Sequence, residues 1–206
     1  MTLADWWHLT WSDLGLPQPK PQVLKDLLGR YAEPHRAYHT AQHLEECCDH
    51  FSRARRFAQD PGAIQLALWF HDAIYDTRSA QNEDQSAAWA ARVLAEAGAP
   101  GPLQAFVRSM ILATKHNAAP DSPDAGLMVD IDLSILGSSV PRFDEYEEQV
   151  RREFAWVPED AFRTARSRIL GEFLARPRIY SSEFFHGLLE AQARSNLQRS
   201  LGRLGA

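Results

Sequence analysis

The stretch LALWFHDAIY, residues 66–75, places a histidine and an aspartate at the end of an apolar run with the length and spacing of a buried helix. A buried helix face normally excludes an aspartate, because desolvating its carboxylate is costly unless a cation or hydrogen-bond donors compensate. The imidazole of His71 supplies a nitrogen that first-row divalent metals favour. The stretch therefore predicts a metal site at a helix end. Ordinary hydrogen bonds of His71 and Asp72 are the alternative.

The bulk composition fits one globular domain. The chain has 206 residues, of which 45% are hydrophobic and 24% charged, and its formal net charge is −5. This acidic balance argues against a protein that coats nucleic-acid polymers, and it leaves small phosphorylated substrates open. Cys47 and Cys48 are adjacent, so they offer neither a disulfide framework nor a CxxC metal site, and we predict two small helical residues.

The chain shows no targeting or membrane signal. Its first residues lack a basic segment followed by an apolar one, and no stretch approaches the ~20 apolar residues that cross a bilayer. We therefore expect a cytoplasmic protein with no membrane partner. Three of the six tryptophans lie near the N-terminus, where they could form an interface patch in a homo-oligomer.

Apolar residues recur at helical spacing along most of the chain, which predicts an all-α, single-domain fold. Asp60 followed by Pro61 is a helix start signal. Asn117–Gly126, rich in proline and aspartate, predicts a surface loop. The expected helices span about residues 23–31, 40–58, 61–72, 83–97, 102–115, 142–156, 159–176 and 182–204.

Two further pairs of residues are of the metal-ligand type. His39 and His43 are four apart, so on a helix they would share one face. Thr40 stands where zinc peptidases of the HExxH type need a glutamate, so that motif is absent. Asp130 and Asp132 lie among apolar residues, where one of them could cap a helix.

Taken in order, His43, His71-Asp72 and Asp132 resemble the H…HD…D signature of the HD superfamily of metal-dependent phosphohydrolases. The resemblance covers about residues 31–197 and implies an HD-type helical bundle, with a core at about 31–137 and a helical extension at about 140–204. Five segments are similar to the predicted-phosphohydrolase branch: Tyr38–His43, Trp69–Asp76, Asn82–Ala87, Asp130–Gly137 and Glu190–Leu197.

The resemblance implies a ligand set for one divalent ion per chain, which could be Mn, Mg, Co, Ni, Fe or Zn. That set is His43, His71, Asp72 and Asp132. A slip in the alignment would exchange Asp132 for Asp130, which is otherwise a supporting or capping residue. His39 matches the histidine that protonates the leaving alkoxide in the related cyclic-nucleotide phosphodiesterases. Those enzymes have asparagine where this chain has Thr40, so their substrate class is not implied.

Further residues are weaker candidates. His116 could contact phosphate or a weakly held second ion, or simply end a helix. Glu83 could act as a general base or hold Lys115, and a helix N-terminus is its alternative role. Three arginines could bind phosphate or lie on solvated helix faces: Arg151, Arg152 and Arg194.

These observations predict a metal-dependent hydrolase of a small phosphate ester or anhydride, such as a nucleotide. Asp72 or Glu83 would orient the attacking water, and His39 or His116 would stabilise or protonate the leaving oxygen. Two alternatives stay open. One is a regulatory module that binds a nucleotide without turnover, and the other is a di-iron oxygenase of the HD type.

Overall fold

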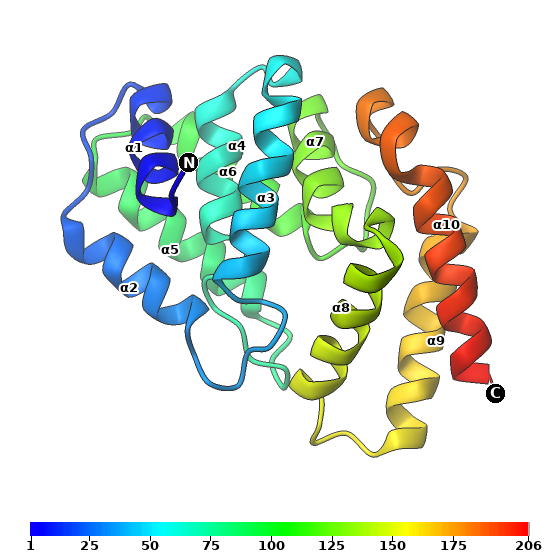
Figure 1. Ribbon diagram of the computed structural model, residues 1–206. Coiled ribbons are helices and arrows are strands. Elements are labelled where there is room, and N and C mark those ends of the chain that lie inside the picture. The colour runs from blue at the N-terminus through cyan, green and yellow to red at the C-terminus, as the bar shows by residue number, and fades with distance from the viewer. Residues whose placement is uncertain (206) are drawn as a thin grey trace. The chain divides into compact units, whose positions relative to one another are not determined.

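The computed structural model describes residues 1–205, and within them every regular element is helical, which confirms the all-α prediction. None of these helices is both long and apolar enough to span a membrane. The elements, labelled in Figure 1, are α1 Leu3–Leu14, α2 Pro21–Tyr31, α3 Ala41–Ala54, η1 Arg55–Phe57, α4 Pro61–Phe70, α5 Asn82–Glu96, α6 Gly101–Ala113, α7 Pro123–Asp132, η2 Leu133–Gly137, α8 Val140–Glu153, α9 Glu159–Ala175 and α10 Glu183–Gly205.

The chain divides into two compact units. Unit 1 is Met1–Asp132 and contains α1 to α7, whereas unit 2 begins at Leu133 and contains η2 and α8 to α10. The boundary falls directly after Asp132. The predicted metal ligands and catalytic residues therefore all belong to unit 1, whereas the three arginine candidates belong to unit 2. The prediction of one domain with a core and an extension stays a prediction.

Helix α4 lies at the centre of unit 1 and packs against α1, α3, α5, α6 and α7. Nine of its ten residues are buried, as its apolar sequence predicts. At Gly62 a Cβ atom would lie 2.7 Å from the backbone nitrogen of Leu14, so α1 approaches too closely for a side chain. The most buried helix of the unit therefore leads directly into His71-Asp72.

The start of α4 follows the predicted signal. The Asp60 carboxylate accepts a hydrogen bond from the Ala63 N–H at 2.9 Å, and Pro61 occupies the first turn. The buried Asp124 carboxylate accepts from the N–H groups of Gln59 and Asp60 at 2.9 and 2.8 Å. The prediction of a loop over Asn117–Gly126 is therefore wrong from residue 123 on, where α7 begins. The hydrogen bonds of Asp124 join this first turn of α7 to the start of α4.

The tryptophans of α1 do not form an exposed patch. Trp6, Trp7 and Trp11 are buried, and the Trp7 ring meets Trp69 edge-on at 5.1 Å. The prediction of an interface patch is wrong for these three, because they cover α4 inside unit 1. Trp156, in unit 2, is 49% exposed. The prediction of a homo-oligomer stays a prediction.

In unit 2, the helices near residues 142–156, 159–176 and 182–204 are present as α8, α9 and α10. A Cβ atom on Gly137 would lie 2.6 Å from the Leu189 Cβ, so η2 packs directly on α10. The Asn196 amide donates to the carbonyls of Leu136 and Ser138, both at 2.9 Å. Asn196, in the part of α10 that is predicted to be similar to the HD branch, thus binds η2 and the residue after it to α10.

Candidate metal centre

Four predicted ligands converge from three segments of unit 1. His43 lies in the first turn of α3, His71 ends α4 and is followed by Asp72, and Asp132 is the last residue of α7. The two Nε2 atoms of His43 and His71 are 3.1 Å apart. His71 Nε2 lies 3.0 Å from Asp72 Oδ2 and 3.4 Å from Asp132 Oδ1. From His43 Nε2 the same two oxygens are 3.5 and 3.4 Å away.

The tautomer of His71 is set by its backbone contact. Its Nδ1 lies 2.8 Å from the Leu68 carbonyl oxygen, which can only accept, so Nδ1 carries the proton. In the neutral ring Nε2 then presents a lone pair toward two carboxylates and a second imidazole. Lone pairs that face one another require either an added proton or a cation between them.

The charges of the cluster favour a cation. Burial alone would raise the pKa of the Asp72 and Asp132 carboxyls, but the surrounding histidines hold both pKa values below the usual range. Burial lowers the pKa of His71, and the two carboxylates more than reverse this, so that it lies well above its usual value. The two carboxylates thus favour positive charge beside His71 Nε2, which a proton or a metal ion would supply.

The carboxylates of the cluster reach solvent, whereas its imidazoles do not. The side chains of His43 and His71 are 2% and 1% exposed, whereas those of Asp72 and Asp132 are 17% and 14% exposed. The protein interior therefore encloses the imidazoles, while water can contact the carboxylates.

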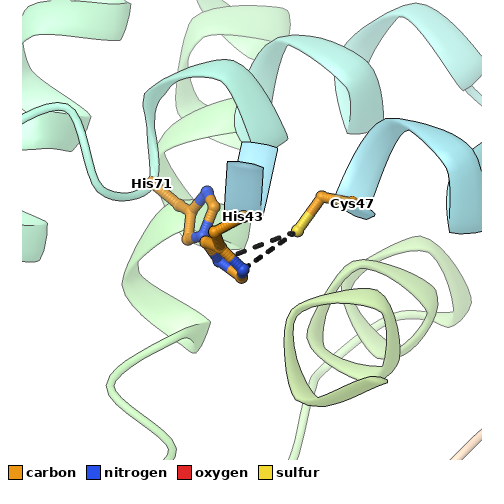
Figure 2. A group of neighbouring side chains, drawn as sticks. All are labelled: His43, Cys47 and His71. Atoms are coloured by element: carbon orange, nitrogen blue, oxygen red, sulfur yellow. Dashed lines mark hydrogen bonds between the residues drawn. The ribbon is translucent and has the colours of Figure 1, made fainter. Parts of the chain in front are cut away.

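Cys47, one turn after His43 on α3, is a neighbour that we predicted only as a small helical residue. The buried group His43, Cys47 and His71 could hold a metal ion (Figure 2). The sulfur lies 3.8 and 3.7 Å from the two ring nitrogens of His43, so it is off the direction of the Nε2 lone pair. Burial, helped by nearby Asp132, raises the pKa of this thiol well above its usual value. The carboxylates are therefore better placed as ligands than the thiol.

His116 contacts the cluster from the end of α6. Its Nε2 lies 3.1 Å from Asp132 Oδ2, the oxygen that does not face His43 and His71. Among residues 1–205 it is the one non-glycine residue with positive φ, at 55°. That conformation is unfavourable for an L-residue and persists only when its surroundings enforce it. The strained backbone thus brings this ring against the carboxylate.

His39 lies beside the cluster but not on α3, which begins only at Ala41. The expectation that His39 and His43 share a helix face is therefore wrong. The His39 ring stacks on Tyr75 with ring centroids 4.1 Å apart, and its centroid lies 6.0 Å from that of His43. The loop thus leaves this imidazole beside the cluster, where it acts after His71 in lowering the pKa of the Asp72 carboxyl.

The structure distinguishes the acidic residues that the sequence left as alternatives. Lys115 pairs with Asp84, Nζ to Oδ2 2.6 Å, so the expectation that Glu83 holds Lys115 is wrong by one residue. Glu83 lies in the first turn of α5, as its alternative role predicted. On α7, Asp132 rather than Asp130 faces both histidines, and Asp130 is fully buried in the same helix.

Arg36 supports the cluster and was missed from the sequence. Its buried guanidinium donates to the carbonyl of Asp72 at 2.6 Å and to that of His39 at 3.2 Å, and its Nε donates to Glu33 at 3.1 Å. It thus ties the loop before α3 to the segment after α4. One arginine in a short polar loop gave no periodic or spacing signal that could have revealed this role.

The arginines proposed for phosphate have other partners in unit 2. Arg151 binds Glu159 and the carbonyls of Phe154 and Val157. Arg194 binds Glu190 and three carbonyls at the end of α9 and after it. Arg152 is exposed. Two of the three thus close helix ends, while Arg152 lies on a solvated face.

Neither a protein-family model nor a curated protein or solved structure matches the chain. The resemblance to HD phosphohydrolases therefore stays a prediction from the sequence motifs.

Proposed function

We propose that the protein is a metal-dependent hydrolase of small phosphate esters or anhydrides. The observation that carries the proposal is the convergence of two imidazole nitrogens, 3.1 Å apart, with two carboxylate oxygens that each lie 3.0–3.5 Å from both nitrogens. Metal–nitrogen and metal–oxygen bonds of about 2.0–2.2 Å place neighbouring ligand atoms roughly 3.0–3.4 Å apart. The spacing of His43, His71, Asp72 and Asp132 therefore suits one ion.

The donor set also limits the metal. Imidazole and carboxylate groups suit Mn, Fe, Co, Ni or Mg and leave coordination positions for further ligands, while structural zinc sites are usually closed by cysteine thiolates. A second ion has less support, since His116 is the one histidine of the sequence between His71 and Asp132. We therefore expect one ion per chain.

A bound divalent ion would supply Lewis-acid activation of water and of a phosphoryl oxygen. The chain's residues would do the rest. The partly exposed Asp72 would orient the attacking water, and His116 would hold the Asp132 carboxylate in place from its outer oxygen. His39, held by Tyr75, would donate a proton to the leaving oxygen.

The test combines metal content with turnover. The purified protein would be loaded with Mn²⁺ or Co²⁺, its metal counted by mass spectrometry, and then assayed with p-nitrophenyl phosphate, bis-p-nitrophenyl phosphate and nucleoside triphosphates. We expect one ion per chain and metal-dependent release of product. Replacing Asp132 by asparagine should reduce turnover at least about 100-fold, the upper range for losing even a ligand's supporting group.

A matched control is His8→Gln, which removes an exposed histidine of α1 outside the cluster and should leave both metal content and turnover unchanged. Metal-loaded protein that hydrolyses none of these compounds would count against the proposal. If such protein bound a nucleotide tightly without product, the regulatory alternative would replace it. Two irons per chain with an oxygen-dependent absorption change would favour the oxygenase alternative.

A further inference from the structure

We propose that a pocket between α2 and α5 binds a small phosphorylated molecule, independently of the metal centre. The pocket has a volume of about 880 Å³, within the range typical of small-molecule sites. Its lining includes Lys25, Gly29 and Arg30 of α2 and Trp89 and Arg92 of α5. None of the four converging ligands lines it. This pocket thus lies apart from the cluster within unit 1.

Each of the two helices places one unpaired basic side chain at this pocket. Lys25 and Arg92 are exposed, and neither has a hydrogen-bond or ion-pair partner among residues 1–205. Both acidic lining residues are engaged, since Asp26 accepts from Gln22, and Glu33 pairs with Arg30 and with Arg36. The three basic lining residues Lys25, Arg30 and Arg92 outnumber the two acids, so the lining carries a net positive charge, which suits a phosphate group.

The rest of the lining suits an apolar or planar part of the ligand. Trp89 is half-buried, and its ring is fixed edge-on against Phe70 at 5.4 Å between centroids. At Gly29 a Cβ atom would meet nothing within 4 Å, so this side of α2 leaves open space. An aromatic wall beside two unpaired cations fits a nucleoside phosphate better than a bare phosphate chain.

The pocket and the metal centre share one supporting segment. Ile74 lines the pocket, whereas Asp72, two residues earlier, faces the histidines of the cluster. Glu33 also lines the pocket, and it holds the Arg36 guanidinium that donates to the Asp72 carbonyl. An occupant would therefore contact the supports of the cluster rather than its ligand atoms, as an effector does.

The test is calorimetric titration of the metal-free full-length protein with ATP and, separately, with tripolyphosphate. We expect ATP to bind both the wild type and Asp132→Asn, and to bind more tightly than tripolyphosphate because of Trp89. Arg92→Glu removes one cation, and Gly29→Leu fills open space while favouring the helix. Each should weaken ATP binding at least about tenfold.

Two matched controls lie in unit 2. Arg152→Glu reverses an exposed arginine, and Gly171→Leu fills open space beside another helix, so both should bind ATP within about twofold of the wild type, a change of under 1 kcal/mol. Helical circular dichroism would verify that all variants fold.

Absence of ATP binding to the metal-free wild type, or unchanged binding by both Arg92→Glu and Gly29→Leu, would overturn the proposal. So would loss of binding in Asp132→Asn alone, which would place the anion at the cluster. Equal affinities for ATP and tripolyphosphate would refute the proposed contact between Trp89 and the nucleoside. Since no metal is present, a failure of hydrolysis leaves this result intact.

Discussion

The two units both remove carboxylates from water, but they give them different partners. In unit 2, the Glu190 carboxylate accepts from the N–H groups of Ile179 and Tyr180 at 3.0–3.2 Å and from Arg194 at 2.8 Å, and His186 Nδ1 lies 3.3 Å from it. In unit 1, Asp72 and Asp132 instead share the same two imidazole nitrogens, those of His43 and His71. A carboxylate that is saturated by donors holds the fold together. Carboxylates that converge on ring nitrogens leave room for an external cation.

The arginines of the two units show the same division. Arg194 binds the Glu190 carboxylate and also the carbonyls that end α9. Arg36 likewise binds carbonyls, among them that of Asp72, but its acidic partner is Glu33. Unit 1 thus fixes the backbone of its cluster with an arginine without neutralising the Asp72 carboxylate itself.

The largest expected effect comes from removing the acid in unit 2. Glu190→Ala should lower the free energy of unfolding by about 3–5 kcal/mol, because it leaves Arg194 and two buried N–H groups without their acceptor. Urea denaturation followed by circular dichroism measures this. A loss no greater than that of an exposed carboxylate would show that Glu190 is not saturated as described.

The second prediction concerns unit 1 and the cation proposed for its cluster. Saturating Mn²⁺ or Co²⁺, at 100 times the dissociation constant, should stabilise the protein by about 2.7 kcal/mol. Asp132→Asn should abolish this gain in stability, since it replaces a charged carboxylate ligand by a neutral amide. Asp144→Asn is the control in unit 2, where that acid pairs with Arg199 and Arg203, and it should keep the gain. Equal metal stabilisation of all three proteins would contradict the comparison.

The third prediction uses pH. Burial would raise the pKa of Glu190, but the N–H groups of Ile179 and Tyr180 and the Arg194 guanidinium hold it below the ordinary value of 4.5. Its contribution to stability is therefore present above pH 4.5 and is lost as the pH falls through the lower pKa of the folded state. The Glu190→Gln protein should lose less stability on acidification in the same range. Parallel acid-unfolding curves for the two proteins would refute this.

The smallest effect is expected where a carboxylate stays in water. Arg168 and Glu172 pair at 2.7 Å, but their side chains are 66% and 61% exposed. Arg168→Ala should change the free energy of unfolding by less than about 0.5 kcal/mol, because solvent screens such pairs. A thermal shift comparable with that of Glu190→Ala would mean that exposure does not separate the two kinds of ion pair.

Local features were predictable because their causes are local. Helical spacing indicated eight of the ten α-helices described, all except α1 and α7, and Asp60 with Pro61 marked the start of α4. The α7 boundary was not predictable, because Asp124 stabilises it through N–H groups 64 and 65 residues away. Burial of the α1 tryptophans was missed for the same reason, since their partners Trp69 and Phe70 lie on α4.

The sequence by itself determined the all-α class, the start of α4 and the residue types that could bind a metal ion. Only the tertiary structure decided that His43 and His71, 28 residues apart, place their Nε2 atoms 3.1 Å from one another. It also decided that Asp132 meets them and that Arg36 supports them. The physical reason is range: helix periodicity acts over a few residues, whereas convergence requires α3, α4 and α7 to pack together.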